Sequence, residues 1–270
     1  MNRYLLLFLL GFLFSILLTP WVRSAARHLG AIDPPDEKRK VHGTPIPRLG
    51  GLAIFISFYL GLFLSYSFNS FSFPDNFLTR IHFGWFFVAS LLAFGVGLID
   101  DIRKISPSVK LAFQVMAGLI VAVMSYRIES ISWPLGTLQL GILSIPVTVL
   151  WIVGITNAIN LLDGLDGLAA GTSLIVCFTM FGIALHDQNT GIALLSLLLA
   201  GSILGYLKYN FHPASIFLGD SGSYFLGFVL SILSLSSGLK GTTTFAILIP
   251  ILTLGLPIMD TGLSMLRRVL

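Results

Sequence analysis

The sequence predicts an all-α integral membrane protein, a polytopic bundle of about nine transmembrane helices in a single domain. Three observations predict this class. Apolar residues make up 55% of the 270 residues and charged residues only 10%, whereas soluble domains carry about 25% charged residues. The mean hydropathy is +0.91. Apolar runs long enough to span a bilayer recur along the chain, and the charges fall between them.

The apolar runs give the expected helices in order. The first run resembles a signal peptide, but no small-residue cleavage site follows it, so we expect a retained helix. Pro146 and Pro250 fall inside later runs, where neighbouring helices can satisfy the loosened backbone. The expected spans are 4–21, 49–67, 82–99, 109–126, 141–158, 168–185, 191–207, 223–238 and 244–263.

Lysine and arginine residues predict the orientation. With the N-terminus outside, twelve of the 16 cations fall in inner loops and only Arg3, Arg80, Arg127 and Lys240 fall outside. Cytoplasmic loops carry such an excess. We therefore expect a multi-pass membrane protein with its N-terminus outside and these basic loops on the cytoplasmic side. Its basic residues would meet anionic lipid head groups, so no nucleic-acid partner is expected.

Five aspartates at the ends of predicted helices are the main indication of function. All lie on the predicted cytoplasmic face. A carboxylate near the hydrocarbon boundary is costly to desolvate unless it meets a cation. We therefore expect a metal-assisted site for an anionic substrate, facing the cytoplasm. The aspartates are Asp100 and Asp101 in GLIDDIRK, Asp163 and Asp166 in NAINLLDGLDGLAAG, and Asp220 in NFHPASIFLGDSGS.

The adjacent pair Asp100 and Asp101 supports two interpretations. Neighbouring like charges raise each other's proton affinity unless a cation intervenes, so one carboxylate could act as a base or both could bind Mg²⁺. Acidic pairs also anchor helix ends to the membrane interface. The pair alone does not decide between these interpretations.

The segment NLLDGLDG is more specific. Asn157, Asn160, Asp163 and Asp166 recur every three residues, so a helix or a tight helical turn would group their side chains along one side. Capping of the flanking helices would explain one of these residues but not four. A binding role is favoured.

Two further loops are less decisive. Asp220 lies between a glycine and a serine in a polar hairpin, where it could bind a metal or simply cap the next helix. His212 of the same hairpin could contact a ligand. In the proline-rich first inner loop, Lys38 and Arg48 could receive a lipid phosphate or serve only as positive-inside anchors.

Taken in order, the segments DPPDEKRKVHGTPIPRLGG, GLIDDIRK, NAINLLDGLDGLAAG and NFHPASIFLGDSGSYFLG resemble the polyprenyl-phosphate N-acetylhexosamine-1-phosphate transferase superfamily, which includes the MraY and WecA/TagO types. The resemblance runs from about Trp21 to the last residue. It implies transfer of a sugar 1-phosphate from a UDP-amino sugar to undecaprenyl phosphate in the membrane, with release of UMP. It also implies a requirement for Mg²⁺, with Mn²⁺ as an alternative ion.

The resemblance also suggests roles for individual residues. Asp100 would act as base or organise the acceptor phosphate, and Phe217 would stack on uracil. Arg268 would lie near the donor phosphate. The expected catalytic residues are Asp100, Asp101 and Lys104; the metal ligands are Asp220 and Asp163; the substrate-binding residues are Asn157, Asn160, Asp163, Asp166, Asn210, Phe217, His212, Lys38, Arg48 and Arg268.

Several alternatives stay open. PRLGG and the His-Pro after Phe211 favour the WecA/TagO type with UDP-N-acetylglucosamine, whereas the MraY type would use UDP-MurNAc-pentapeptide. Family members have 10 to 11 spans and a His-rich loop after the ninth, which we expect this chain, ending in MLRRVL, to lack. A homodimer and a non-catalytic remnant that binds lipid phosphate are both compatible with the sequence. A secondary transporter is disfavoured, because its charges would lie at mid-membrane.

Overall fold

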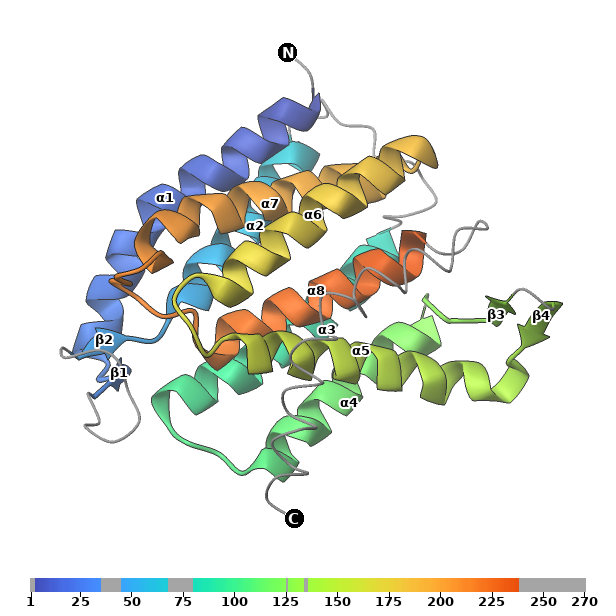
Figure 1. Cartoon of the computed structure of the whole chain (residues 1–270), viewed down its shortest axis with the longest axis horizontal. Helices are drawn as coiled ribbons and strands as arrows, with labels where there is room; N and C mark the ends of the chain where they lie inside the picture. The colour runs from blue at the N-terminus through green and yellow to red at the C-terminus, as the bar shows by residue number, and fades with distance from the viewer. Residues whose placement is uncertain (1–2, 35–44, 68–79, 125, 134–135, 238–270) are drawn as a thin grey trace.

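The computed structural model describes residues 3–34, 45–67, 80–124, 126–133 and 136–237. Within them the chain forms eight α-helices and two short β-hairpins (Figure 1). The helices are α1 (Arg3–His28), α2 (Gly50–Ser67), α3 (Arg80–Ile102), α4 (Pro107–Met124), α5 (Ser144–Leu162), α6 (Leu168–His186), α7 (Thr190–Asn210) and α8 (Gly219–Ser237).

These helices confirm the all-α prediction for the described residues, because each of the first eight expected spans overlaps one of them. Six of them, α1 and α3 to α7, are long and apolar enough to cross a membrane, and α2 contains a shorter apolar stretch, Gly50–Ser65. The ninth expected span, 244–263, lies outside the described residues. Two antiparallel hairpins were not predicted. Strand β1 (Ile32–Asp33) pairs with β2 (Ile46–Pro47), and β3 (Ser130–Trp133) pairs with β4 (Gly136–Gln139).

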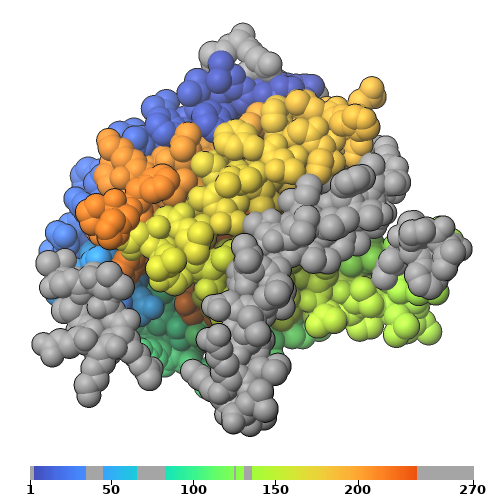
Figure 2. Space-filling view, viewed as in Figure 1, coloured from blue at the N-terminus to red at the C-terminus, as the bar shows by residue number. Residues whose placement is uncertain are grey.

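Helices α1, α7 and α6 form one half of the bundle, which we call the scaffold half, and Figure 2 shows them side by side across one face. Helix α7 is its centre, with 89% of its span buried. Glycines let α1 and α7 approach closely, because a Cβ at Gly201 would lie 2.1 Å from the Phe8 carbonyl oxygen. A Cβ at Gly205 would lie 2.5 Å from the Phe12 carbonyl oxygen. Small residues at such crossings are how membrane helices pack without a hydrophobic driving force.

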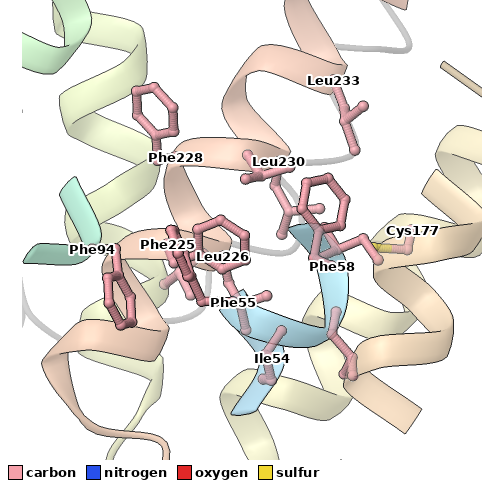
Figure 3. Close-up of a cluster of buried hydrophobic side chains, with 14 of the residues drawn as sticks. Ile54, Phe55, Phe58, Phe94, Cys177, Phe225, Leu226, Phe228, Leu230 and Leu233 are labelled. Carbon is pink, nitrogen blue, oxygen red and sulfur yellow. The ribbon is translucent and has the colours of Figure 1, made fainter. Parts of the chain in front are cut away.

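Helices α3, α4, α5 and α8 form the other half, which we call the site half, and α2 packs between the two halves. An aromatic cluster joins α2, α3 and α8 (Figure 3). Phe55 of α2 stacks on Phe94 of α3 at 4.2 Å between ring centroids and meets Phe225 of α8 edge-on at 5.1 Å. Such pairs add specific ring geometry to the burial of a large apolar surface.

The start of α8 is fixed by close backbone contacts at one end of the bundle. A Cβ at Gly97 of α3 would lie 2.5 Å from the Asp220 carbonyl oxygen, and a Cβ at Gly51 of α2 would lie 2.1 Å from the Gly222 nitrogen. The C-terminal ends of α3 and α5 and the N-terminal ends of α4 and α8 converge at this end of the bundle. In Figure 1 these ends of α5 and α8 lie toward the left. The aspartates lie at this end.

Candidate active site

A lysine bridges two of the aspartates where α3, α4 and α8 meet. Lys110 Nζ in the first turn of α4 donates to Asp100 Oδ2 at 3.1 Å and to Asp220 Oδ2 at 3.0 Å. The other Asp100 oxygen accepts the Ile105 N–H at 2.9 Å, which closes the short α3–α4 link. The three side chains are 16–20% exposed. The cluster is therefore charged, largely enclosed and within reach of a ligand.

Helix α5 completes this cluster through Asn160. Its Nδ2 donates to Asp220 Oδ1 at 3.1 Å and to Ser223 Oγ at 2.9 Å. Both carboxylate oxygens of Asp220 are thus held, one by Lys110 and one by Asn160. Four helices contribute to a single polar network, which no one segment of the sequence could form alone.

Asp101 points in a different direction from its neighbour Asp100. It is 8% exposed, and its oxygens accept three hydrogen bonds from the start of α8. Oδ1 accepts the Asp220 N–H at 2.8 Å, and Oδ2 accepts the Ser221 N–H at 3.0 Å and the Ser221 hydroxyl at 2.6 Å. The adjacent acidic pair is therefore divided between Lys110 and the backbone of α8.

Asp163 lies just beyond the last residue of α5, as its C-cap. Burial raises the pKa of its carboxyl group well above the usual range, and the nearby carboxylates of Asp101 and Asp220 raise it further. Arg48 and a hydrogen bond with the Gly219 backbone oppose this rise. A cation bound beside this carboxyl group would favour its ionised form.

The fit to a metal ion can be judged from these donors. The described part of the chain contains no group of three or more His, Cys, Asp or Glu side chains able to hold a metal by themselves. Mg²⁺ differs from metals that need such cages, because it is usually bound by one or two carboxylates together with substrate phosphates and water. Asp220 and Asp163 supply hard oxygen ligands close to one another. The residues fit Mg²⁺ held jointly with phosphate.

Asp166 anchors the hairpin between α7 and α8. Its Oδ2 accepts the Ala214 N–H at 3.0 Å and lies 2.9 Å from His212 Nδ1. The His212 side chain is 78% exposed. The amide of Asn210 is buried in the same hairpin and donates to the Ile216 carbonyl oxygen at 3.0 Å. These three residues support the segment that carries Asp220, and their substrate contacts stay predictions.

The first inner loop is also joined to this segment. Phe217 N–H donates to the Pro47 carbonyl oxygen at 2.8 Å, and Gly50 N–H donates to the Phe217 carbonyl oxygen at 2.9 Å. Arg48 lies between these contacts and pairs with Asp33 at 3.3 Å. Backbone hydrogen bonds therefore join PRLGG to the residues just before Asp220.

Two of the remaining expected site residues, Lys104 and Phe217, lie within the described part of the chain. Lys104 is exposed in the α3–α4 link, and Phe217 is half-buried. Lys38 and Arg268 lie outside the described residues.

The expected grouping of four polar residues on one side holds only in part. Asn157 Nδ2 donates to Gln114 Oε1 of α4 at 2.6 Å, while Asn160 and Asp163 face the start of α8. Asp166 turns instead toward the α7–α8 hairpin. The cause is that α5 ends at Leu162, so the spacing of three no longer corresponds to one helical face beyond it.

Sequence reasoning missed two residues of this cluster, Lys110 and Gln114. They lie one turn apart on α4, and Gln114 is only 3% exposed. By sequence, Lys110 is simply one of the twelve inner-loop cations. The available signal was a lysine and a glutamine four residues apart in an otherwise apolar helix, since intramembrane polar residues usually face the bundle interior.

Comparison with known proteins gives consistent similarities. The model of glycosyl transferase family 4 matches residues 83–238. A Bacillus subtilis (strain 168) protein named probable undecaprenyl-phosphate N-acetylglucosaminyl 1-phosphate transferase is 43% identical over 272 residues, which cover 100% of this chain and 73% of that protein.

Two more distant relatives extend the comparison. The decaprenyl-phosphate N-acetylglucosaminephosphotransferase of Mycobacterium tuberculosis (strain ATCC 25618 / H37Rv) is 35% identical over 92% of this chain and 66% of its own length. The phospho-N-acetylmuramoyl-pentapeptide-transferase of Clostridium beijerinckii is 33% identical over 84% of this chain and 72% of its own length. The chain thus spans just under two thirds of the mycobacterial relative.

Proposed function

Because the chain belongs to glycosyl transferase family 4, we propose that it transfers N-acetylglucosamine 1-phosphate from UDP-N-acetylglucosamine to undecaprenyl phosphate. The products would be UMP and a lipid-linked pyrophosphoryl sugar, the starting unit of a cell-envelope glycan. The Bacillus relative named for this reaction is 43% identical, against 33% for the relative named for a muramoyl-pentapeptide donor. The amino-sugar donor is therefore preferred over the MraY-type donor.

The observation that carries the proposal is the bridge from Asp100 through Lys110 to Asp220, with Asn160 on the far side. Both reactants carry phosphate, so their mutual repulsion must be neutralised while the reacting groups are held in line. Lys110 supplies a fixed positive charge between two carboxylates at a helix junction. On arrival of the phosphates its ammonium group can exchange one carboxylate for a phosphate oxygen.

The proposed transfer is a single displacement at phosphorus. An oxygen of the acceptor phosphate forms a bond to the β-phosphorus of the donor, and the bond from that phosphorus to the bridging oxygen breaks, so UMP leaves with the electron pair. In this proposal Asp100 accepts the remaining proton of a singly protonated acceptor phosphate or orients that phosphate through Lys110; the contact between Asp100 and Lys110 supports either role. Lys110 also stabilises the negative charge that develops on the phosphoryl oxygens.

Asp220 and Asp163 would hold Mg²⁺ at this site, with Mn²⁺ as an alternative. When bound, the ion supplies charge neutralisation for the donor pyrophosphate and the departing UMP. Asn160 keeps the Asp220 carboxylate oriented, and the Asp101 and Asp220 carboxylates close enough to Asp163 to affect its pKa support this choice of ligands.

The proposed setting is the bacterial cytoplasmic membrane, with the N-terminus outside and the site facing the cytoplasm. Supporting this, the end of α1 near the site contains Arg23 and Arg27, and the aspartates cluster at the same end of the bundle. A nucleotide sugar arrives from water, whereas a lipid phosphate moves within the bilayer, so a site at a helix end is accessible to both. A homodimer stays a prediction.

The test is a transfer assay on the purified protein in detergent with Mg²⁺, undecaprenyl phosphate and UDP-N-acetylglucosamine labelled in the sugar. We expect label in the lipid phase, one UMP released per label, and loss of both on chelation of Mg²⁺. Asp220→Asn should abolish transfer, and UDP-MurNAc-pentapeptide should not replace the donor.

Three results would overturn the proposal. Release of UDP in place of UMP would indicate transfer of the sugar without its phosphate. Retention of lipid phosphate without turnover would favour the non-catalytic remnant. Full activity of Asp220→Asn would remove the proposed site.

A further inference from the structure

We propose that Asp101 is a positioning residue of this site: it holds the first turn of α8 so that the Asp220 carboxylate lies between Lys110 and Asn160. This goes beyond the general function, and its activity readout rests on the proposed function. The two neighbouring acids would then have different tasks. Asp100 faces the charged cluster, whereas Asp101 acts on the reaction only through the backbone of α8.

The contacts of Asp101 support this division. Its two oxygens accept three hydrogen bonds, all from Asp220 and Ser221, at 2.6–3.0 Å. An ionised carboxylate at a helix N-terminus is favoured by the unpaired N–H groups and the positive end of the helix dipole. Both oxygens of Asp101 are therefore directed at the first turn of α8.

The surroundings of Asp101 are shaped for the same contact. Gly97 lies one helical turn before Asp101 on α3, and a Cβ there would lie 2.5 Å from the Asp220 carbonyl oxygen. Gly219 has a φ of +76°, and a Cβ on it would lie 2.6 Å from Asp101 Oδ2. Two glycines thus allow the α8 backbone to come within hydrogen-bond distance of the acid.

By holding the Asp220 backbone, Asp101 also sets the direction of the Asp220 side chain. The N–H that Asp101 accepts and the carboxylate that meets Lys110 and Asn160 belong to the same residue. Fixing the Asp220 nitrogen fixes the direction of its Cβ, and a shift of about 1 Å at a reacting group can cost about 100-fold in rate. A small loosening of the helix end would therefore move the carboxylate without unfolding the bundle.

Hydrogen–deuterium exchange on the purified protein tests this inference without relying on activity. In Asp101→Asn the amides of Asp220 and Ser221 should exchange about 10-fold faster or more, because the side-chain amide offers one acceptor oxygen in place of two. Ser221→Ala, which removes one of the three bonds, should show a smaller increase. Asp187→Asn at the opposite end of the bundle is the isosteric control and should leave these amides unchanged.

Kinetics provides the second readout. With Asp101→Asn we expect a reduced transfer rate and a higher Mg²⁺ concentration for half-maximal rate, while the shape of the pH–rate profile is unchanged.

Loss of all transfer with unchanged exchange at Asp220 and Ser221 would overturn the inference and make Asp101 a group that touches substrate. Should Asp101→Asn fail to fold, Ser221→Ala decides: unchanged exchange in that variant also overturns the inference. A wild-type protein without transferase activity would instead remove the proposed function and leave the exchange result standing.

Discussion

The scaffold half and the site half are both built from apolar helices, but these helices serve different purposes. In α7, 89% of the span is buried, whereas in α4 only 28% is buried. Yet α4 supplies Lys110 and Gln114 to the polar network, and α7 supplies glycines to a close helix crossing. Burial alone does not separate the two roles, because α8 is buried along nearly its whole length and carries Asp220. What distinguishes the site half is that its helices supply charged and polar side chains that bond one another.

Energetics explains this difference. Helix packing in a membrane depends on close contact over a long interface, so the scaffold half tolerates little added volume. The site half instead holds charges that need partners, and its helices meet at their ends, where water and substrates can reach them. Substitutions in the two halves should consequently fail in different ways, by loss of stability in one and loss of rate in the other.

The largest expected effect is on rate, in the site half. Lys110→Met should lower the transfer rate by about 10²- to 10³-fold, because a fixed charge facing the developing phosphate charge is removed. The protein should stay folded, since Asp100 and Asp220 are 16–19% exposed and can be hydrated. Initial rates and size-exclusion profiles measure this.

Lys208→Met provides the matched control, because this exposed lysine lies over the Tyr209 ring at the end of α7. Lys104→Met tests the sequence-based role of that exposed lysine, and we expect a smaller loss than for Lys110→Met. A loss equal to that of Lys110→Met would contradict this ranking of the two lysines.

The next effect is on stability, in the scaffold half. Gly201→Ala should lower the free energy of unfolding by about 1–3 kcal/mol, because its Cβ would lie 2.1 Å from the Phe8 carbonyl oxygen and the helices must separate. The rate per folded molecule should change little. Thermal melting in detergent measures the stability change. Gly182→Ala is the control, because nothing lies within 4 Å of its added Cβ; equal melting temperatures of the two variants would refute the tight crossing.

A smaller effect is expected at the polar pair of α4 and α5. Gln114→Leu should lower the transfer rate by about 10-fold, since Asn157 loses the 2.6 Å contact that orients its amide. The effect should appear mainly as a higher KM for the nucleotide sugar if Asn157 binds that substrate. An unchanged KM and rate would separate Asn157 from the site.

The smallest effect is expected at the exposed contact between His212 and Asp166. His212→Ala should change the rate by no more than about 5-fold, because an exposed polar contact of this kind contributes about 0–1 kcal/mol and Asp166 keeps the Ala214 N–H. Asp166→Ala removes both contacts and should have a larger effect. A severe loss with His212→Ala would mean that its ring contacts substrate.

The sequence predicted the helices well because membrane-spanning length is a local property. It missed that α8 begins at Gly219, four residues before the expected span, since that start is stabilised by Asp101 from a distant helix. It also could not separate Asn210, which bonds its own hairpin, from a substrate ligand. An asparagine or aspartate in a loop has the same local pattern in both roles, and only its three-dimensional partner distinguishes them.

A divalent ion held by Asp220 can be detected by direct measurement. Titration of the purified protein with Mn²⁺ in the presence of UDP-N-acetylglucosamine, followed by electron paramagnetic resonance, counts the bound ions. We expect one bound Mn²⁺ per chain that Mg²⁺ displaces, and none in Asp220→Asn at the same concentration. Unchanged binding in that variant, with its fold intact, would contradict a site formed by Asp220.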